Sequence, residues 1–255
     1  MTLNFIDICT QLESWFESPR GRYLLAQEQQ LSSDLLHNVF GYHQLQLGAT
    51  RKQPLALESR LGHRIYCNSQ PGDLLTLQSE PGCLPFANDS IDAIVLHHAL
   101  DFADDPHGLL REVHRVLAHQ GQIIVFGFNP VSLFGAGTRI AGLRPGSIWR
   151  QAHHLSIFRL RDWLHLLGAE VQETRHCFAM PPAGGERLFK GLSHCDRFAG
   201  RYKLPVGGVY AIRAIKKVST LTPTREGWRR KVGARLIGLA APNPVPSPRS
   251  LDSAA

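Results

Sequence analysis

Residues 90–128 read SIDAIVLHHALDFADDPHGLLREVHRVLAHQGQIIVFGF, and this stretch decides the fold. Residues 92–96 predict a buried strand, because four apolar side chains follow Asp92. Residues 106–119 place apolar side chains at helical spacing and predict an amphipathic helix, which we expect Gly121 to end. Residues 122–128 form a second apolar run, suited to the middle of a parallel sheet. A strand, a helix and a strand in this order favour an α/β fold.

The same alternation extends to both sides of this stretch. Further helices are predicted over residues 8–16, 21–37 and 160–168. Further strands are predicted over residues 42–48, 63–68, 74–77, 169–173 and 208–215. Residues 129–154 are rich in glycine and predict a loop or lid over the carboxyl edge of the sheet. The sequence therefore favours a doubly wound α/β sheet.

Composition narrows the class of protein. The chain has 255 residues, of which 43% are hydrophobic and 19% charged, which is enough apolar material for one substantial core. No apolar run is long enough to cross a membrane, and the first 16 residues lack the pattern of a signal peptide. Five cysteines form no CxxC pair, which argues against a disulfide framework or a structural zinc site. We expect a cytoplasmic protein without a metal.

The positive charge lies mostly in the last part of the chain. Lysine and arginine number 28 against 21 acids, a formal net charge of +7. From Lys217 onward there are seven basic and two acidic residues, so this tail carries +5 and the remainder +2. Contact with nucleic acid, or with an anionic membrane, is therefore expected only through the tail, which otherwise reads as solvated and disordered.

Between residues 80 and 128 the chain carries a series of short motifs. In chain order they are residues 84–86 (LPF), 90–92 (SID), His98 with Leu100, 110–113 (LREV) and 115–117 (RVL). In these motifs the chain resembles the central block of class I S-adenosylmethionine-dependent methyltransferases of the type 11 group. Looser matches extend this resemblance to about residues 40–216. The resemblance implies a mainly parallel seven-stranded sheet, and methyl transfer from S-adenosylmethionine to a small-molecule or lipid-like acceptor.

The resemblance also implies a division of the chain into three parts. Residues 1–39 would form an N-terminal helical cap, and residues 40–216 a methyltransferase-like α/β domain with a lid loop at about 129–154. Residues 217–255 would form a basic, largely disordered tail. The oligomeric state is not indicated.

The resemblance assigns candidate site residues. Glu80 falls on the acid that contacts adenine, Cys83 and Leu84 would flank the base, and Gly48 would let the backbone approach the methionine part. His97 and His98 would lie at the strand end facing the sulfonium, where either could accept a proton from the nucleophile. Three residues after the last central strand would line the acceptor pocket: Asn129, Ser132 and Phe134.

The chain also departs from the family pattern. The first strand of the family ends in Gly-x-Gly-x-Gly, of which only Gly48 remains. The acid that binds the ribose has no clear match. Asn68 is the best placed substitute and Asp73 a poorer one, while Pro81 lacks the N–H that often meets adenine. A small bacterial branch of the group shares this eroded turn and the sequence at 129–133 (NPVSL). The alternative reading is a degenerate methyltransferase fold that binds a ligand or protein without catalysis.

Overall fold

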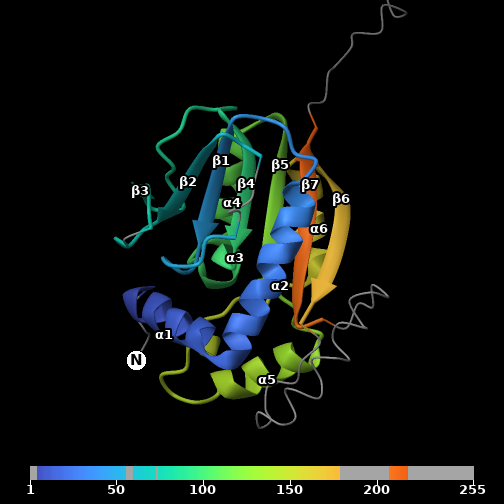
Figure 1. The fold of residues 1–255 in the computed structure, drawn as a ribbon. Coiled ribbons are helices and arrows are strands. Elements are labelled where there is room, and N and C mark those ends of the chain that lie inside the picture. The colour runs from blue at the N-terminus through green and yellow to red at the C-terminus, as the bar shows by residue number, and fades with distance from the viewer. Residues whose placement is uncertain (1–4, 56–59, 73, 179–206, 218–255) are drawn as a thin grey trace, which may run out of the picture. The chain divides into compact units, whose positions relative to one another are not determined.

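The computed structural model describes residues 5–55, 60–72, 74–178 and 207–217, all within a compact unit that spans residues 1–219. Seven strands form one sheet in the order β3-β2-β1-β4-β5-β7-β6 (Figure 1). All neighbouring strands are parallel except β7, which is antiparallel to β5 and β6. The strand bounds are β1 His43–Gly48, β2 His63–Asn68, β3 Leu77–Gln78, β4 Ile91–His97, β5 Leu117–Phe128, β6 Ala169–Cys177 and β7 Val209–Lys216. This topology confirms the predicted doubly wound, mainly parallel seven-stranded fold.

Helices cover both faces of the sheet, with α2 on one face and α4 and α6 on the other (Figure 1). The helix bounds are α1 Phe5–Glu17, α2 Pro19–Leu36, α3 Ala99–Phe102, α4 Pro106–Val116, α5 Leu133–Gly142 and α6 Ile157–Leu166, with a 3-10 turn, η1, over Ile148–Arg150. The break between α1 and α2 follows from local chemistry. Ser18 caps α2 by accepting a hydrogen bond from the Gly21 N–H, and Pro19 occupies the first helical position.

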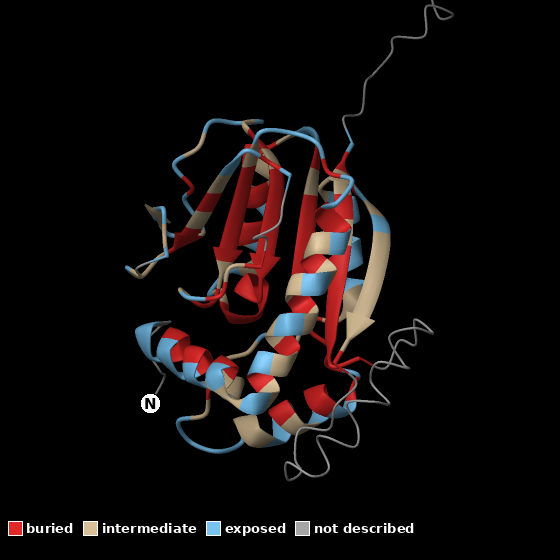
Figure 2. Cartoon of the chain, viewed as in Figure 1, coloured by how far each residue is buried: buried red, intermediate tan, exposed pale blue. Residues whose placement is uncertain are grey.

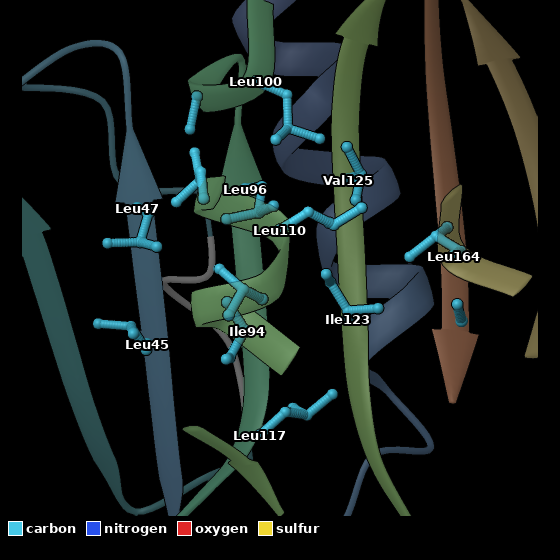
Figure 3. Close-up of a cluster of buried hydrophobic side chains, with 14 of the residues drawn as sticks. Leu45, Leu47, Ile94, Leu96, Leu100, Leu110, Leu117, Ile123, Val125 and Leu164 are labelled. Atoms are coloured by element: carbon cyan, nitrogen blue, oxygen red, sulfur yellow. The ribbon is translucent and has the colours of Figure 1, made fainter. Parts of the chain in front are cut away.

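The central strands feed two apolar cores by simple alternation. On β4, Ile94 and Leu96 pack toward α4 (Figure 3), whereas Ala93 and Val95 pack toward α2. Successive side chains of a strand point to opposite faces, so a strand buried on both faces must be apolar throughout. This requirement explains why the unbroken run in β4 is a reliable strand signal.

A third apolar cluster lies beyond the carboxyl ends of the parallel strands. It joins α1, α5 and η1 to the ends of β5 and β7 through Phe16, Phe128, Phe134, Ile148 and Val209, among others. Each of α1, α2 and α5 carries buried residues on one side and exposed residues on the other (Figure 2). The ends of β5 and β7 at this edge of the sheet are therefore covered by α1, α5 and η1.

The prediction that a helix runs to residue 119 and is ended by Gly121 is wrong. The helix α4 stops at Val116, and β5 begins at once with Leu117, which pairs with Ile91 of β4. Lys216 holds this junction: its Nζ donates to the carbonyl oxygens of His114 and Leu117, both at 2.8 Å, and to Asp89 Oδ1 at 2.7 Å. A partner 99 residues away in sequence overrides the helical periodicity.

Two further expectations need correction. Residues 129–154 do not form a plain loop, because they contain α5 and η1. Ser132 starts α5, since its Oγ accepts from the Gly135 N–H at 2.9 Å. The strand expected at residues 74–77 is instead the two-residue strand β3 at Leu77–Gln78, which pairs with the end of β2.

The remaining expectations on domain organisation stay predictions. The expected tail at 217–255 lies outside the described residues apart from Lys217. None of the helices in the described ranges is long and apolar enough to cross a bilayer.

The α4–β5 junction makes a first prediction. The Lys216→Met variant leaves two carbonyl oxygens and the Asp89 carboxylate without their donor, so we expect the free energy of unfolding to fall by about 1–3 kcal/mol. Urea denaturation measures it. The matched control is Lys217→Met, whose side chain is 61% exposed and which should change stability by less than about 0.5 kcal/mol. Equal losses in the two variants would contradict the assigned role of Lys216.

Candidate functional site

A cavity of about 450 Å³ lies at the carboxyl end of the sheet. Three segments line it, one after β2, one after β3 and one at the start of α4. Its lining residues are Ser69, Gln70, Glu80, Pro81, Gly82, Ala103, Asp104, Asp105, Gly108 and Leu109. Glu80 is exposed at this cavity, so its carboxylate is available to a ligand. Ligands of open α/β sheets bind at this edge, which makes the cavity the leading candidate site.

Asn68 holds the turn that follows β1. Its Nδ2 donates to the carbonyl oxygens of Gly48 at 2.8 Å and Thr50 at 3.4 Å, and its Oδ1 accepts from the Gln70 N–H at 2.9 Å. Both amide hydrogens are thus engaged, and the side chain is buried. The structure places Asn68 beside the eroded glycine turn, where its amide meets backbone rather than the open cavity.

Glu13 and Arg51 form a second clamp on the same turn. Glu13 of α1 accepts from the Arg51 backbone N–H and Nε through Oε1, and from Nη2 through Oε2, at 2.8–2.9 Å. Burial alone would raise the pKa of Glu13, but the hydrogen bonds and charge of Arg51 outweigh it and lower the pKa. Sequence reasoning missed this pair, since no motif links positions 38 residues apart.

His97 and His98 converge on one buried carboxylate. Glu28 of α2 lies with Oε2 at 3.1 Å from His97 Nε2 and with Oε1 at 2.8 Å from His98 Nε2. His98 has a left-handed backbone (φ 53°), which brings both rings to the same acid although neighbouring strand residues normally diverge. His98 Nδ1 lies 2.9 Å from Asp101 Oδ2, and the ring stacks on Phe128 at 3.9 Å.

This arrangement sets the charge of each ring. Burial lowers the pKa of His98, but Glu28 and Asp101 outweigh that effect and raise it to about 9. Burial would raise the pKa of Glu28, and the two histidines instead lower it to about 2. For His97 burial prevails over Glu28, so its pKa falls. At neutral pH His98 is an imidazolium paired with Glu28, while His97 is neutral.

The same three residues are the described group best placed for a metal ion. One ligand atom from each of Glu28, His97 and His98 lies within 4.8 Å of the others. However, the separations of 2.8 and 3.1 Å are hydrogen-bond lengths, and the carboxylate already neutralises an imidazolium. The expected lack of a metal stays a prediction.

Leu84 belongs to the core rather than to the cavity lining. Its side chain is buried in the main cluster, its N–H donates to Glu112 Oε1 at 2.8 Å, and its carbonyl oxygen accepts from Arg115 Nη2 at 3.1 Å. Arg115 also donates to the Phe86 carbonyl oxygen. The LPF and LREV–RVL motifs therefore clamp the loop after β3 to α4. Cys83 is exposed on that loop.

Asn129, Ser132 and Phe134 start α5. Asn129 Nδ2 donates to the Gly207 carbonyl oxygen at 2.9 Å, and Ser132 Oγ donates to the Asn129 carbonyl oxygen at 2.8 Å. Phe134 lines a second cavity of about 360 Å³, together with Trp15 and Trp149 among others. Among the three, Phe134 alone lines either of these cavities.

Comparison with known proteins shows which of them resemble this chain in sequence and in fold. The family model described as methyltransferase domain matches residues 59–125. The protein YafS of Escherichia coli, itself uncharacterised, is 32% identical over 170 residues, which cover 66% of this chain and 70% of YafS. A methyltransferase from Thermotoga maritima, described as a possible histamine N-methyltransferase, superposes with a TM-score of 0.58 at 19% identity, covering 82% and 95% of the two chains. The [4+2]-cyclase SpnF superposes with a TM-score of 0.52 at 17% identity, covering 75% and 80%.

The sheet, its covered carboxyl edge and these likenesses define a class I S-adenosylmethionine-dependent methyltransferase fold. Within that class, the chain belongs to the type 11 methyltransferase family. The family and the fold expected from the short motifs of residues 80–128 are thereby confirmed.

The buried carboxylate makes a second prediction. The raised pKa of His98 contributes stability that is present below about pH 6.5 and is lost as the pH rises through about 9. The lowered pKa of Glu28 contributes stability that is present above about pH 4.5 and is lost as the pH falls toward 2. We expect Glu28→Gln to lower the free energy of unfolding by about 3–5 kcal/mol near pH 6. We also expect it to flatten the decline between pH 6.5 and 9.

Chemical denaturation across this pH range measures both effects. Asp34→Asn is the matched control, because Asp34 lies on the same helix with a largely exposed side chain. This control should follow the wild-type profile. A Glu28→Gln profile that runs parallel to the wild type would show that His98 does not carry the charge assigned to it.

Proposed function

We propose that the chain binds S-adenosylmethionine at the carboxyl ends of β1, β2 and β3 and transfers its methyl group to a small-molecule or lipid-like acceptor. The observation that carries this proposal is the 450 Å³ cavity, which lies beside the end of β2 and the loop after β3. A cavity of this size suits a nucleoside. Membership of the methyltransferase family supports the reaction class.

The adenosine part would lie against the loop after β3. The exposed Glu80 carboxylate can accept hydrogen bonds from an adenine amino group, and exposed Cys83 lies on the same loop. Pro81 has no N–H to offer, so the polar contacts fall to the other polar residues of the lining, which are Ser69, Gln70, Glu80, Asp104 and Asp105. Leu84 would act indirectly, by fixing this loop to α4.

The methionine part would approach the turn after β1. A Cβ at Gly48 would lie 3.0 Å from the Thr50 carbonyl oxygen, so the turn is tight there and favours glycine. Asn68 and the Glu13–Arg51 pair would be positioning residues that hold this turn by side-chain hydrogen bonds. They would hold the turn compact through side-chain contacts, whereas the family uses a glycine-rich backbone for this purpose.

When bound, the sulfonium supplies an activated methyl group, so the chain's task is alignment and exclusion of water. His98 is charged near neutral pH and cannot accept a proton there. His97 is neutral, and its Nδ1 is buried without a hydrogen-bond partner among the described residues. His97 is therefore the better candidate for taking the acceptor's proton as the methyl group is transferred. Its ring lies 5.4 Å from that of Phe16, so α1 would have to shift to admit the acceptor.

The acceptor would occupy the second cavity, between α1 and α5. Three aromatic side chains in its lining, Trp15, Phe134 and Trp149, suit the apolar part of a molecule, and Arg144 adds one positive charge. Phe128 connects this cavity to the histidines, since it contacts Phe134 at 5.7 Å and stacks on His98. The Phe128 ring would therefore have to move, along with α1, for an acceptor in this cavity to come within hydrogen-bond reach of His97.

A second candidate function is binding without methyl transfer. It is favoured by the engagement of Asn68 and Arg51 within the protein and by the complete burial of both histidines. The fold is also shared with a protein named as a cyclase, so the fold alone does not fix the reaction.

Calorimetric titration with S-adenosylmethionine and S-adenosylhomocysteine separates these candidates. We expect saturable binding with a dissociation constant in the micromolar range, and we expect Glu80→Ala to weaken it about 10–100-fold through loss of a charge-assisted hydrogen bond. Glu170→Ala, an exposed acid on β6, is the control and should leave the affinity unchanged. Wild-type protein that shows no heat at millimolar ligand would favour the non-catalytic candidate.

A further inference from the structure

A cluster of exposed aliphatic side chains lies on and beside α5. Val131, Leu133, Ile140 and Leu143 are 83%, 69%, 69% and 80% exposed. Ten large apolar side chains are exposed among the described residues, and these four fall within 13 consecutive positions. Single exposed leucines need no explanation, but such a concentration marks an interaction surface.

The geometry of α5 places Leu133 and Ile140 on one side, with Val131 just before the helix and Leu143 just after it. Leu133 and Ile140 are seven positions apart, two helical turns, and thus share a face. Phe134 and Thr138 point inward and are buried. Arg139 lies on the exposed part of the helix, and Arg144 follows directly after Leu143. We call Val131, Leu133, Arg139, Ile140, Leu143 and Arg144 the α5 surface. Two of its members, Ile140 and Arg144, also line the second cavity.

The surroundings of the α5 surface are basic. Residues 113–161 contain six arginines and no Asp or Glu, whereas a segment of this length would hold about four acids at the chain's average. Arg139, Arg144 and Arg150 are all exposed, and no described carboxylate forms a salt bridge with them. Exposed aliphatic groups next to unopposed positive charge are complementary to a surface that is both apolar and anionic.

We propose that the α5 surface docks onto an anionic phospholipid bilayer. The aliphatic side chains would enter the boundary between headgroups and acyl chains, while Arg139 and Arg144 remain among the phosphates. A second copy of this chain fits less well, because its own arginines would repel these. Single-stranded nucleic acid also fits less well, because the exposed apolar residues are aliphatic and offer no stacking platform.

Docking of this kind needs no helix that crosses the membrane. Interfacial helices lie in the membrane plane with one apolar face buried, and positive charge strengthens their binding to anionic lipids. Each arginine near such a surface adds about fivefold to the partition coefficient at moderate ionic strength. The inference does not depend on methyl transfer, because vesicle binding and cofactor binding are measured separately.

Co-sedimentation of the full-length chain with large vesicles tests the proposal. We expect binding to vesicles of equal parts phosphatidylcholine and phosphatidylglycerol, weak binding to pure phosphatidylcholine, and a decrease with added salt. Substituting the apolar pair, Leu133→Ser with Ile140→Ser, should weaken binding at least about tenfold. Substituting the basic pair, Arg139→Gln with Arg144→Gln, should do the same.

The control is a matched pair on α6, Phe158→Ser with Leu166→Ser, which removes equally exposed apolar groups elsewhere and should leave binding unchanged. A second comparison is Arg229→Gln, Arg230→Gln and Lys231→Gln in the basic tail, outside the described residues. Failure of the wild type to bind anionic vesicles would overturn the proposal. So would binding that only the tail substitutions abolish. Sensitivity to the arginines but not to the apolar pair would also overturn it, because it would show electrostatic attraction without insertion of the aliphatic side chains.

Discussion

The carboxylate of Glu28 joins the helix that covers one face of the sheet to the end of its central strand. It contacts both His97 and His98 and is fully buried. Burying an acid in this way is costly unless its partner is charged, so the acid keeps His98 protonated and holds its unusual backbone. His98 in turn fixes Asp101, which accepts from the Phe128 N–H at 3.0 Å. One ionic contact thereby aligns α2, β4, α3 and β5 at the carboxyl edge of the sheet.

The turn after β1 is kept compact in a different way from the glycine-rich turn of the family. A glycine-rich turn is compact because its backbone can adopt angles that other residues avoid. Here Asn68 of β2 and Glu13 of α1 form side-chain hydrogen bonds with the backbone of the turn, so side chains outside the turn fix its conformation. The consequence is that α1 is tied to the turn after β1, rather than being a removable cover above the sheet.

The sequence predicted the parts of the fold that depend on local pattern. The strand β4 follows from its unbroken apolar run, and most of α2 from the helical spacing of residues 21–37, although α2 begins two residues earlier, at Pro19. The end of α4 was missed because it depends on Lys216, which reaches it from the far end of the chain. The start of α5 was missed because glycines masked its periodicity, although Ser132 is an ordinary helix cap.

In the candidate site, too, the residues within local motifs could be predicted from the sequence and those that depend on distant contacts could not. Glu80 could be placed at a cavity because it is fixed by the motifs around it, which lock the loop after β3 to α4. The role of Glu28 could not be predicted, because an acid in the middle of a polar helical stretch looks like a solvated residue. Its importance comes from a contact 70 residues away in sequence, which periodicity cannot reveal.

The clamp on the β1 turn also constrains how the family can change. Glycines in a turn can be lost or regained one at a time, but Glu13 and Arg51 are useful only together. Loss of Glu13 would leave the partly buried guanidinium of Arg51 without its carboxylate, and loss of Arg51 would leave the buried Glu13 carboxylate without its cation. Each single substitution is therefore disfavoured. Among relatives with this eroded turn, the two positions should therefore covary, with an acid at the first wherever a guanidinium stands at the second. If the Gly-x-Gly-x-Gly turn were restored, Glu13 would no longer be needed to hold it, and the sequence of α1 could then diverge.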